Sequence, residues 1–144
     1  MKLSTKLIYG LQFLLNLTEK NEKEFIQIKE VVRKESISEK YLENIVSQLK
    51  SSGLLIVKRG AQGGYKLSRS QDKITLKEIF QILEGLELMP EGVGNGDNAS
   101  LNMTVVSSMV SNFEGLLIEK LEQMTLKELQ DSKIELMNYS NYQI

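Results

Sequence analysis

The chain has 144 residues, a hydrophobic fraction of 41% and a formal net charge of −1 at pH 7, which suits one small domain, or a small domain with an oligomerisation arm. It contains no cysteine and no histidine, so disulfides, thiolate metal sites and Ser-His-Asp chemistry are excluded. No two carboxylates have a recognisable catalytic spacing, and we therefore expect a protein that is not an enzyme and holds no metal or cofactor.

The first expected element is an amphipathic helix that begins after Ser4. Its apolar residues recur three and four positions apart between Leu7 and Leu17, which is typical of a face buried in the core. Lys2 and Lys6 lie near its start, where they can meet a phosphate backbone. Polar residues interrupt the stretch and no cleavage site follows it, which argues against a signal peptide. No segment is long enough to span a bilayer, so we expect a cytoplasmic protein without a membrane partner.

Residues 25–53 predict a helix-turn-helix. A short β-like run at 25–28 precedes a helix at about 29–35, and Ser36 and Ile37 form the turn into a second helix. Ser38 is placed as the N-cap of this second helix, and Gly53 stands where a helix commonly ends. Two helices joined by a turn of this length are typical of a helix-turn-helix.

The second helix has one apolar face and one polar face. The apolar residues have the spacing of a buried stripe and are Tyr41, Leu42, Ile45, Val46 and Leu49. The polar face carries side chains that donate or accept hydrogen bonds, namely Glu39, Lys40, Glu43, Asn44, Ser47, Gln48 and Lys50. Such a face can read base edges in DNA, although a polar helix face is usually just a solvated one.

Two short β-type runs, at 54–57 and 65–68, are joined by Lys58, Arg59, Gly60, Ala61, Gln62, Gly63 and Gly64. Because glycines permit a tight reversal, these runs predict a β-hairpin with a narrow cationic tip. An arginine on such a tip can enter the minor groove of A/T-rich DNA. A hairpin with two basic residues is, taken alone, usually a solvated turn. A base-reading helix, a glycine stop and a cationic hairpin in succession favour a winged helix instead.

The rest of the chain divides into a helix, a linker and a long C-terminal segment. A capping box from Thr75 to Glu78 opens a helix that ends near Gly85 and completes a first domain at residues 1–86. Residues 87–100 predict a flexible linker, because 89–100 holds the only proline and three glycines among small polar residues.

Residues 101–144 predict a long dimerisation helix at 101–124 and, after a second capping box at Thr125, a short helix at 126–137. A helix of this length outside a completed domain must bury its apolar stripe, and the simplest partner is a second copy across a two-fold axis. Folding back onto the first domain is the alternative, and both can hold for different faces. The residues expected in the dimer contact are Val106, Val110, Phe113, Leu117, Leu121 and Met124.

The charges are divided unequally along the chain. Residues 1–80 carry fifteen Lys and Arg against nine Asp and Glu, whereas residues 81–144 carry three against ten. The first part can therefore neutralise phosphates and the second cannot. Chance segregation is the alternative explanation, but it would have to coincide with the helix and wing pattern.

Five segments stand in order along nearly the whole chain: LSTK at 3–6, ISEKYLENIVSQLKSSGLL at 37–55, VKRGAQGGYKL at 57–67, ITLKEIFQILEG at 74–85 and TLKEL at 125–129. Together they resemble the IscR/NsrR/CymR family of bacterial winged-helix transcription regulators. The resemblance implies a homodimer that binds a pseudo-palindromic operator in double-stranded DNA, with the recognition helix in the major groove and the wing in the minor groove.

Matched to the family's motifs, Ser38, Lys40, Tyr41, Glu43 and Asn44 correspond to its DNA-contacting stretch. Arg59 and Gly60 correspond to the wing residues that meet the minor groove, and Tyr41 keeps a place in the core as an equal alternative. Glu43 lies where a cytosine amino group can be read. The full set expected at DNA is Lys2, Lys6, Ser38, Lys40, Tyr41, Glu43, Asn44, Ser47, Gln48, Lys58, Arg59, Gly60 and Gln62.

The chain departs from the family in one segment. Cluster-binding members place three cysteines in the linker that corresponds to about 89–104, where this chain has Gly, Asn, Asp and Ser. The resemblance therefore implies a member without an iron-sulfur cluster, and it leaves open an effector small molecule or a partner enzyme as the source of the signal. Glu91 and Asp97 in this segment are expected to be solvated carboxylates and not a cation site.

The sequence thus predicts a mainly α fold with a small β-hairpin, a winged helix-turn-helix domain followed by a long dimerisation helix. The predicted function is that of a sequence-specific DNA-binding regulator, a repressor acting as a homodimer. The alternative is a protein-interaction module that docks a metabolic enzyme through its winged helix or its acidic C-terminal half. Steep salt dependence of binding would separate the first from the second.

Overall fold

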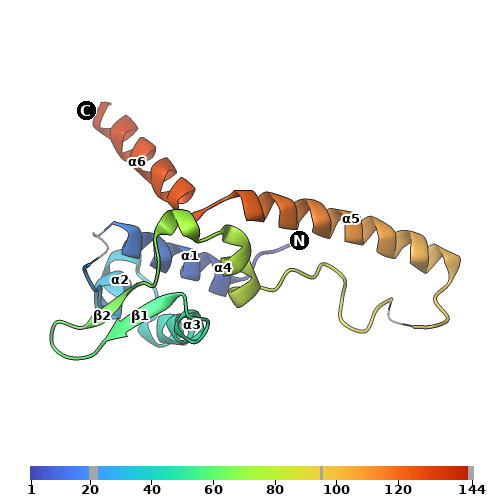
Figure 1. Cartoon of the computed structure of the whole chain (residues 1–144), viewed down its shortest axis with the longest axis horizontal. Helices are drawn as coiled ribbons and strands as arrows, with labels where there is room; N and C mark the ends of the chain where they lie inside the picture. Colours follow the sequence, from blue (N-terminus) through green and yellow to red (C-terminus); the bar gives the residue numbers. More distant parts are fainter. Residues whose placement is uncertain (20–22, 95, 143–144) are drawn as a thin grey trace.

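The computed structural model describes residues 1–19, 23–94 and 96–142, and Figure 1 shows their arrangement. The elements in chain order are α1 (Thr5–Thr18), α2 (Ile28–Glu35), α3 (Glu39–Ser51), β1 (Leu55–Lys58), β2 (Gly64–Leu67), the 3-10 helix η1 (Gln71–Lys73), α4 (Leu76–Leu83), α5 (Leu101–Gln123) and α6 (Leu126–Tyr142). The two strands form an antiparallel sheet. A mainly α fold with a small β-hairpin is confirmed.

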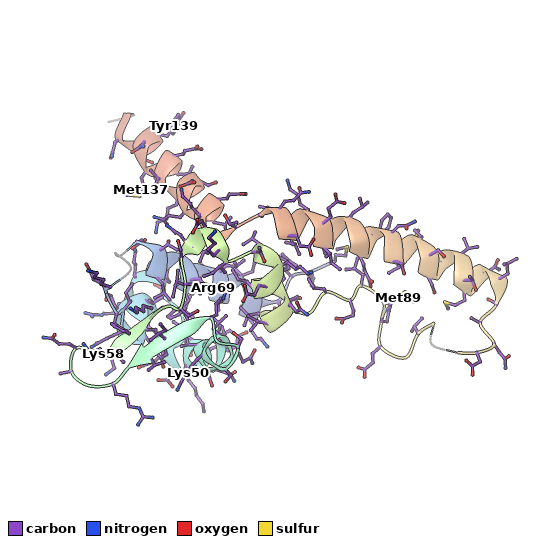
Figure 2. All side chains as sticks on the ribbon, in the orientation of Figure 1. Lys50, Lys58, Arg69, Met89, Met137 and Tyr139 are labelled. Atoms are coloured by element: carbon purple, nitrogen blue, oxygen red, sulfur yellow. The ribbon has the colours of Figure 1, made fainter. Side chains whose placement is uncertain are left out.

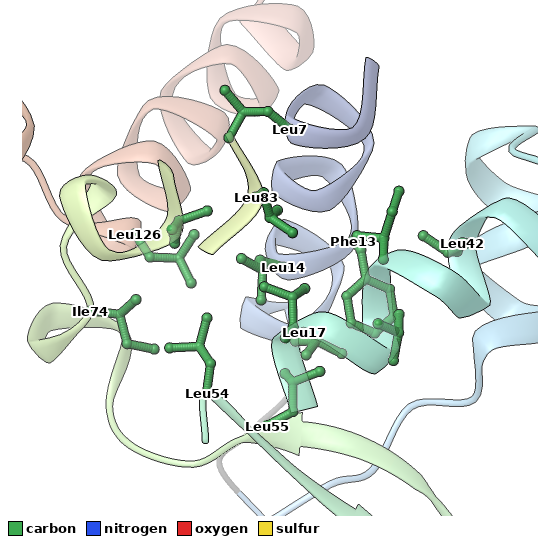
Figure 3. Packing of buried hydrophobic residues seen from close by; sticks show 14 of the residues in the cluster. Leu7, Phe13, Leu14, Leu17, Leu42, Leu54, Leu55, Ile74, Leu83 and Leu126 are labelled. Atoms are coloured by element: carbon green, nitrogen blue, oxygen red, sulfur yellow. The ribbon is translucent and has the colours of Figure 1, made fainter. Parts of the chain in front are cut away.

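Helix α1 forms the centre of the core. Ser4 caps its start, since the Ser4 hydroxyl accepts a hydrogen bond from the Leu7 N–H at 3.1 Å. The buried side chains of α1 pack against α3, α4 and the hairpin, and Figure 3 shows Phe13 of α1 beside Leu42 of α3. Gly10 permits the close crossing of these helices, because a Cβ at Gly10 would meet the side chain of Leu83.

Both ends of α3 are determined by backbone conformation. Before α3, Ser36 is left-handed, with φ 55° and ψ 43°, and its N–H donates to Val32 O at 3.0 Å. After α3, Gly53 has a φ of 85°, its N–H donates to Lys50 O at 3.0 Å, and the Leu54 N–H donates to Leu49 O at 3.2 Å. This pair of bonds is the Schellman arrangement that a glycine permits. Ser38 and Gly53 thus stand where the sequence predicted them.

The β-like run expected at 25–28 does not form a strand. Ile26 makes a single bridge with Tyr65, and α2 already begins at Ile28. The first strand also begins at Leu55 and not at Leu54, because the Leu54 N–H is used to close α3. The hairpin therefore has two strands, to which the segment before α2 adds one paired residue.

The end of α5 and the start of α6 belong to the same core as the first 86 residues. Leu121 and Leu126 are buried in it. The Leu76 N–H donates to Met124 O at 2.9 Å, and the Leu126 N–H donates to Ile74 O at 2.9 Å. The division of the chain near residue 100 stays a prediction, but the hydrophobic core crosses it. Leu121 is 4% exposed within one chain, which corrects its expected place in a dimer contact.

Helix α5 matches the predicted long helix, whereas α6 is longer than predicted and runs from Leu126 to Tyr142 instead of ending near residue 137. The reason is local, since residues 126–142 contain neither glycine nor proline to end the helix. Figure 1 shows α6 projecting from the body of the molecule, and α5 running away from it on the other side. Within the described ranges, none of the helices combines the length and the apolar character that crossing a membrane requires.

Candidate nucleic-acid interface

Helix α3 presents a polar face to solvent. Leu42, Ile45, Val46 and Leu49 are buried and hold the helix against the core. The side chains left exposed on α3 are Glu39, Lys40, Tyr41, Glu43, Asn44, Ser47 and Lys50, with Gln48 half-buried beside them. The Gln48 amide donates to Asn44 Oδ1 at 3.3 Å. Ser38 caps the helix by position and makes no side-chain capping bond.

Tyr41 is the one residue of the expected apolar stripe that the fold does not bury. Its side chain is 37% exposed, and its ring meets the ring of Tyr9 edge-on, with 5.7 Å between centroids and an interplanar angle of 82°. The expected burial of Tyr41 is therefore wrong, because this position lies at the margin of the stripe where α3 meets α1. The contact with Tyr9 positions the ring at the edge of the polar face.

The hairpin ends in an exposed, narrow tip. Lys58 pairs with Gly64 in the register of the strands, and the Gly63 N–H donates to Gly60 O at 3.0 Å across the tip. Gly60 has a φ of 109°, a value that favours glycine. A Cβ at Gly63 would collide with the backbone at Lys58. The side chains of Lys58, Arg59 and Gln62 are exposed on this tip, as the sequence predicted.

The base of the hairpin is tied to the segment that leads into α2. Ile26 and Tyr65 exchange two backbone hydrogen bonds, of 2.9 and 2.8 Å. The ring of Phe25 lies under two hairpin cations, Lys58 Nζ at 5.7 Å and Lys66 Nζ at 5.0 Å from its centroid. In the register of the strands, Lys66 lies directly opposite Ile56. Because Ile56 and Lys58 are two positions apart on β1, the side chains of Lys58 and Lys66 lie on the same face of the hairpin. Lys66 was not predicted at this interface, although its position in the strand pattern places it on the same face as Lys58.

Helix α3 and the hairpin tip lie on the same side of the molecule, opposite α5 and α6 (Figure 1). In Figure 2, Lys50 and Lys58 are both labelled on this side. The structure thus brings together the expected residues of α3 and the hairpin. Lys2 is exposed and Lys6 is half-buried, but Figure 1 shows the N-terminus on the side of α5, away from the hairpin. Contact of Lys2 and Lys6 with DNA stays a prediction.

Ion pairs engage several of the cations outside this face. Lys34 pairs with Glu19 at 2.6 Å, Lys77 pairs with Glu122 at 2.6 Å, and Arg69 pairs with Glu78. In the part of the chain that the structure describes, no such pair engages the basic residues of α3 or the hairpin tip, which are Lys40, Lys50, Lys58 and Arg59. These four cations remain available to an external anion.

The acidic residues make no metal site in residues 1–19, 23–94 and 96–142, where no group of three or more carboxylates lies close enough to hold an ion. The segment 89–104 offers only Glu91 and Asp97 as charged side chains. An iron-sulfur cluster is held by cysteine thiolates, in some centres together with histidine, and the chain has neither residue. The residues present therefore do not fit such a cluster.

A second surface, on α5, is apolar and open. Leu101, Val105, Met109, Phe113 and Leu116 are exposed along one side of the helix, and we call this set the outer stripe of α5. Of the residues expected in a dimer contact, Val106 and Phe113 are exposed. Val110, Leu117 and Met124 are half-buried. The last turns of α5 pack on α4 and the core, so the open apolar surface is displaced toward the start of the helix.

A family model described as "Rrf2: Iron-dependent Transcriptional regulator" matches residues 3–132 of the chain. The chain is similar to HTH-type transcriptional regulator CymR of Bacillus subtilis, 41% identical over 85 residues, which are 59% of this chain and 62% of that protein. It is similar to the HTH-type transcriptional regulator slr0846 of Synechocystis, 31% identical over 131 residues, which are 90% of this chain and 87% of that protein. With CymR and two further relatives the match spans only 58–66% of the relative's length.

Two solved structures have a similar fold over nearly the whole chain. The structure of CymR, the global cysteine regulator of B. subtilis, superposes with a TM-score of 0.76 at 29% identity and covers 92% of this chain and 98% of its own. IscR of T. potens superposes with a TM-score of 0.70 at 28% identity and covers 92% of this chain and 88% of its own. Both likenesses include the α5 and α6 segments, since they extend beyond the winged helix.

Proposed function

Because the chain belongs to the Rrf2 family of transcriptional regulators, we propose that it represses transcription in the cytoplasm as a homodimer bound to a pseudo-palindromic operator. The family consists of regulators and not of enzymes. In each subunit α3 enters the major groove and the hairpin is the wing that enters the adjacent minor groove. The predicted residues of α3 and the wing supply the contacts.

One observation carries this proposal, the joint exposure of the polar face of α3 and the cationic wing tip on one side of the molecule. An α-helix fits the major groove, where amide and carboxylate side chains can read base edges. The exposed and unneutralised cations of α3 and the wing, Lys40, Lys50, Lys58 and Arg59, match the phosphate charge that surrounds both grooves.

The outer stripe of α5 supports a homodimer. A monomeric protein rarely exposes a contiguous row of large apolar side chains on one helix. Pairing two copies through α5 buries this row and places two α3 helices on one molecule. The two half-sites of the operator are then separated by about 34–36 Å or a multiple of one helical turn.

The signal that controls the regulator reaches it without an iron-sulfur cluster, because the chain has no cysteine or histidine to hold one. The signal then comes from a small-molecule effector or from a partner enzyme. The segment 87–100 and α5 form an open cavity of about 560 Å³ lined by residues that include Glu87, Ser107 and Glu114. We expect an effector to contact the protein in this open cavity.

Selection of bound fragments from the source genome with the purified protein tests the proposal. We expect a small set of fragments that share a two-fold related sequence and lie upstream of genes. Their binding should weaken steeply with salt, with a slope of about −0.9 per phosphate contact in a plot of log K against log salt.

Recovery of random fragments, or binding that does not change with salt, would contradict the proposal and favour the protein-interaction alternative. In that case the same polar face would dock a protein, and salt would have little effect on a mainly apolar contact. Transcription from a selected promoter, with and without the protein, then decides between repression and activation.

A further inference from the structure

A part-buried polar cluster links α1 to the end of α2, just before the turn in front of α3. Asn16 is 4% exposed and is the one buried polar residue of the described chain. Its Nδ2 donates to Gln12 O at 2.8 Å and to Glu35 Oε1 at 2.8 Å. The side-chain amide of Gln12 donates to Glu35 Oε2 at 3.2 Å. Each oxygen of the Glu35 carboxylate is thus held by an amide from α1.

The position of Glu35 gives this cluster its significance. Glu35 is the last residue of α2, Ser36 follows in the left-handed conformation, and α3 begins at Glu39. A carboxylate at a helix C-terminus faces the negative end of the helix dipole, so Glu35 does not favour α2 as a helix. Of the two basic residues in the last turn of α2, Lys34 pairs with Glu19, which leaves Arg33 to offset this charge.

The cluster lies beside the turn that joins α2 to α3, and the two helices also pack directly against each other. Ile37 is buried behind the turn, but a single apolar side chain restrains the position of the turn more than the angle at which α3 leaves it. The two amide donors from α1 hold both oxygens of the Glu35 carboxylate and so fix the orientation of the carboxylate plane. Hydrogen bonds to a charged group are stronger than those between neutral groups. A turn held in this way adds a restraint on the angle between α3 and α1, beside the packing of the buried face of α3 on the core.

We propose that Asn16 and Gln12 are positioning residues that act through Glu35 to hold α3 at the angle needed for reading DNA. The functional part of this inference rests on the proposed function, whereas the angle of α3 can be measured without DNA. Loss of the clamp is expected to widen the range of α3 angles. Affinity for the selected operator then falls more than affinity for unrelated DNA, since phosphate contacts tolerate misalignment better than base contacts.

The angle is measured by the distance between nitroxide labels on Ile8→Cys and Lys50→Cys, two exposed sites on α1 and α3. The chain has no native cysteine to interfere, and dilution with unlabelled protein removes distances between subunits. Asn16→Asp places two carboxylates face to face and should broaden or shift the distance distribution. Asn16→Asp with Glu35→Gln restores a donor opposite an acceptor and should narrow it again. Gln12→Ala, a milder change, should broaden it less.

The control is Gln130→Ala, which removes another α1 side-chain bond, the one that the Thr18 hydroxyl donates to Gln130 Oε1 at 2.7 Å. This bond joins α1 to α6 and not to the turn. We expect Gln130→Ala to lower thermal stability without changing the label distance. An unchanged distance in folded Asn16→Asp and Gln12→Ala, or an equal change in Gln130→Ala, would overturn the clamp.

The effect on DNA reading is measured as the dissociation constant for unrelated duplex divided by that for the selected fragment. Both constants are measured at a temperature where every variant is folded. We expect Asn16→Asp to lower this ratio about tenfold, the double variant to recover it, and Gln130→Ala to leave it unchanged. If Asn16→Asp broadens the distance but leaves the ratio intact, the clamp does not serve DNA reading. If the parent protein selects no fragment at all, the proposed function fails, and the label distances still decide the clamp.

Discussion

Arg59 carries a permanent charge to the end of the wing, where it is exposed and enters no ion pair within the described residues. Removing it with Arg59→Ala should weaken operator binding and reduce the magnitude of the salt slope by about 1, the contribution of one phosphate-contacting cation. Binding should also lose its preference for A/T pairs under the wing. Fluorescence anisotropy across a salt series measures both effects.

The matched control for Arg59 is Lys127→Ala. Lys127 also carries one positive charge, but it lies on α6, where it pairs with Asp131 at 3.0 Å. Its removal changes the net charge by the same amount far from α3 and the wing. Equal losses of affinity in the two variants would mean that only net charge matters, and the wing would then have no specific contact with DNA.

Glu43 should act on base choice more than on affinity. Its carboxylate is exposed on the face of α3, and a carboxylate accepts a hydrogen bond from the cytosine amino group while it repels phosphates. In Glu43→Ala, discrimination at one base pair of each half-site should fall by about 1–3 kcal/mol. Competition between operator fragments altered at single base pairs measures this. A variant with unchanged preference at every position would show that Glu43 does not read a base.

At the scale of the element, the two ends of α3 make opposite predictions. Ser36 has a φ of 55° and Gly53 a φ of 85°, and both values lie in the left-handed region where a Cβ is costly. Ser36→Gly should therefore raise the free energy of unfolding and Gly53→Ala should lower it, each by about 1 kcal/mol. A Cβ at Gly53 would touch nothing within 4 Å, so the second effect isolates backbone strain.

Urea unfolding, monitored by circular dichroism, measures these changes as shifts of the midpoint urea concentration with an unchanged m-value. Ser51→Ala, at the exposed last residue of α3, is a control with right-handed backbone and should change stability by less. Shifts of the same sign for Ser36→Gly and Gly53→Ala would contradict the assigned conformations.

Elements with local signals could be predicted from the sequence. The cap at Ser38, the stop at Gly53, the glycine-rich wing tip and the hydroxyl caps at Thr75 and Thr125 all depend on residues within one turn. The Thr75 hydroxyl accepts from the Glu78 N–H at 3.2 Å, and the Thr125 hydroxyl accepts from the Glu128 N–H at 3.3 Å. These bonds form half of each predicted capping box. In the first box, the Glu78 side chain is engaged by Arg69.

Features that depend on distant contacts could not be predicted in this way. Residues 25–28 have a strand-like composition, but only Ile26 pairs, because the partner edge of β2 is short and α2 starts at once. Tyr41 has the spacing of a buried residue and meets Tyr9 at the surface instead. Leu121 belongs to the core because α5 folds back on α4. The cluster of Asn16, Gln12 and Glu35 joins two helices and leaves no pattern in the sequence.

At the scale of the whole molecule, the outer stripe of α5 should hold two copies together. Phe113 is 54% exposed toward the C-terminal end of this stripe. Phe113→Glu would bury an unpaired charge in the dimer contact, and the dimer dissociation constant should rise by at least about a hundredfold. Sedimentation equilibrium measures it, with Ser132→Glu on α6 as the control that adds the same charge away from the stripe. A Phe113→Glu protein that stays dimeric would assign the contact to another surface.

The position of the protein on its operator tests most directly whether α3 and the wing read DNA. Because the chain has no cysteine, single cysteines at Ser47, Gln62 and Ser132 can each carry an iron chelate that cuts nearby DNA strands. We expect the Ser47 probe to cut within each half-site from the major groove and the Gln62 probe to cut beside it from the minor groove. The Ser132 probe on α6 should not cut. Cutting from Ser132 with none from Ser47 or Gln62, on a fragment that the protein binds specifically, would contradict the assigned interface.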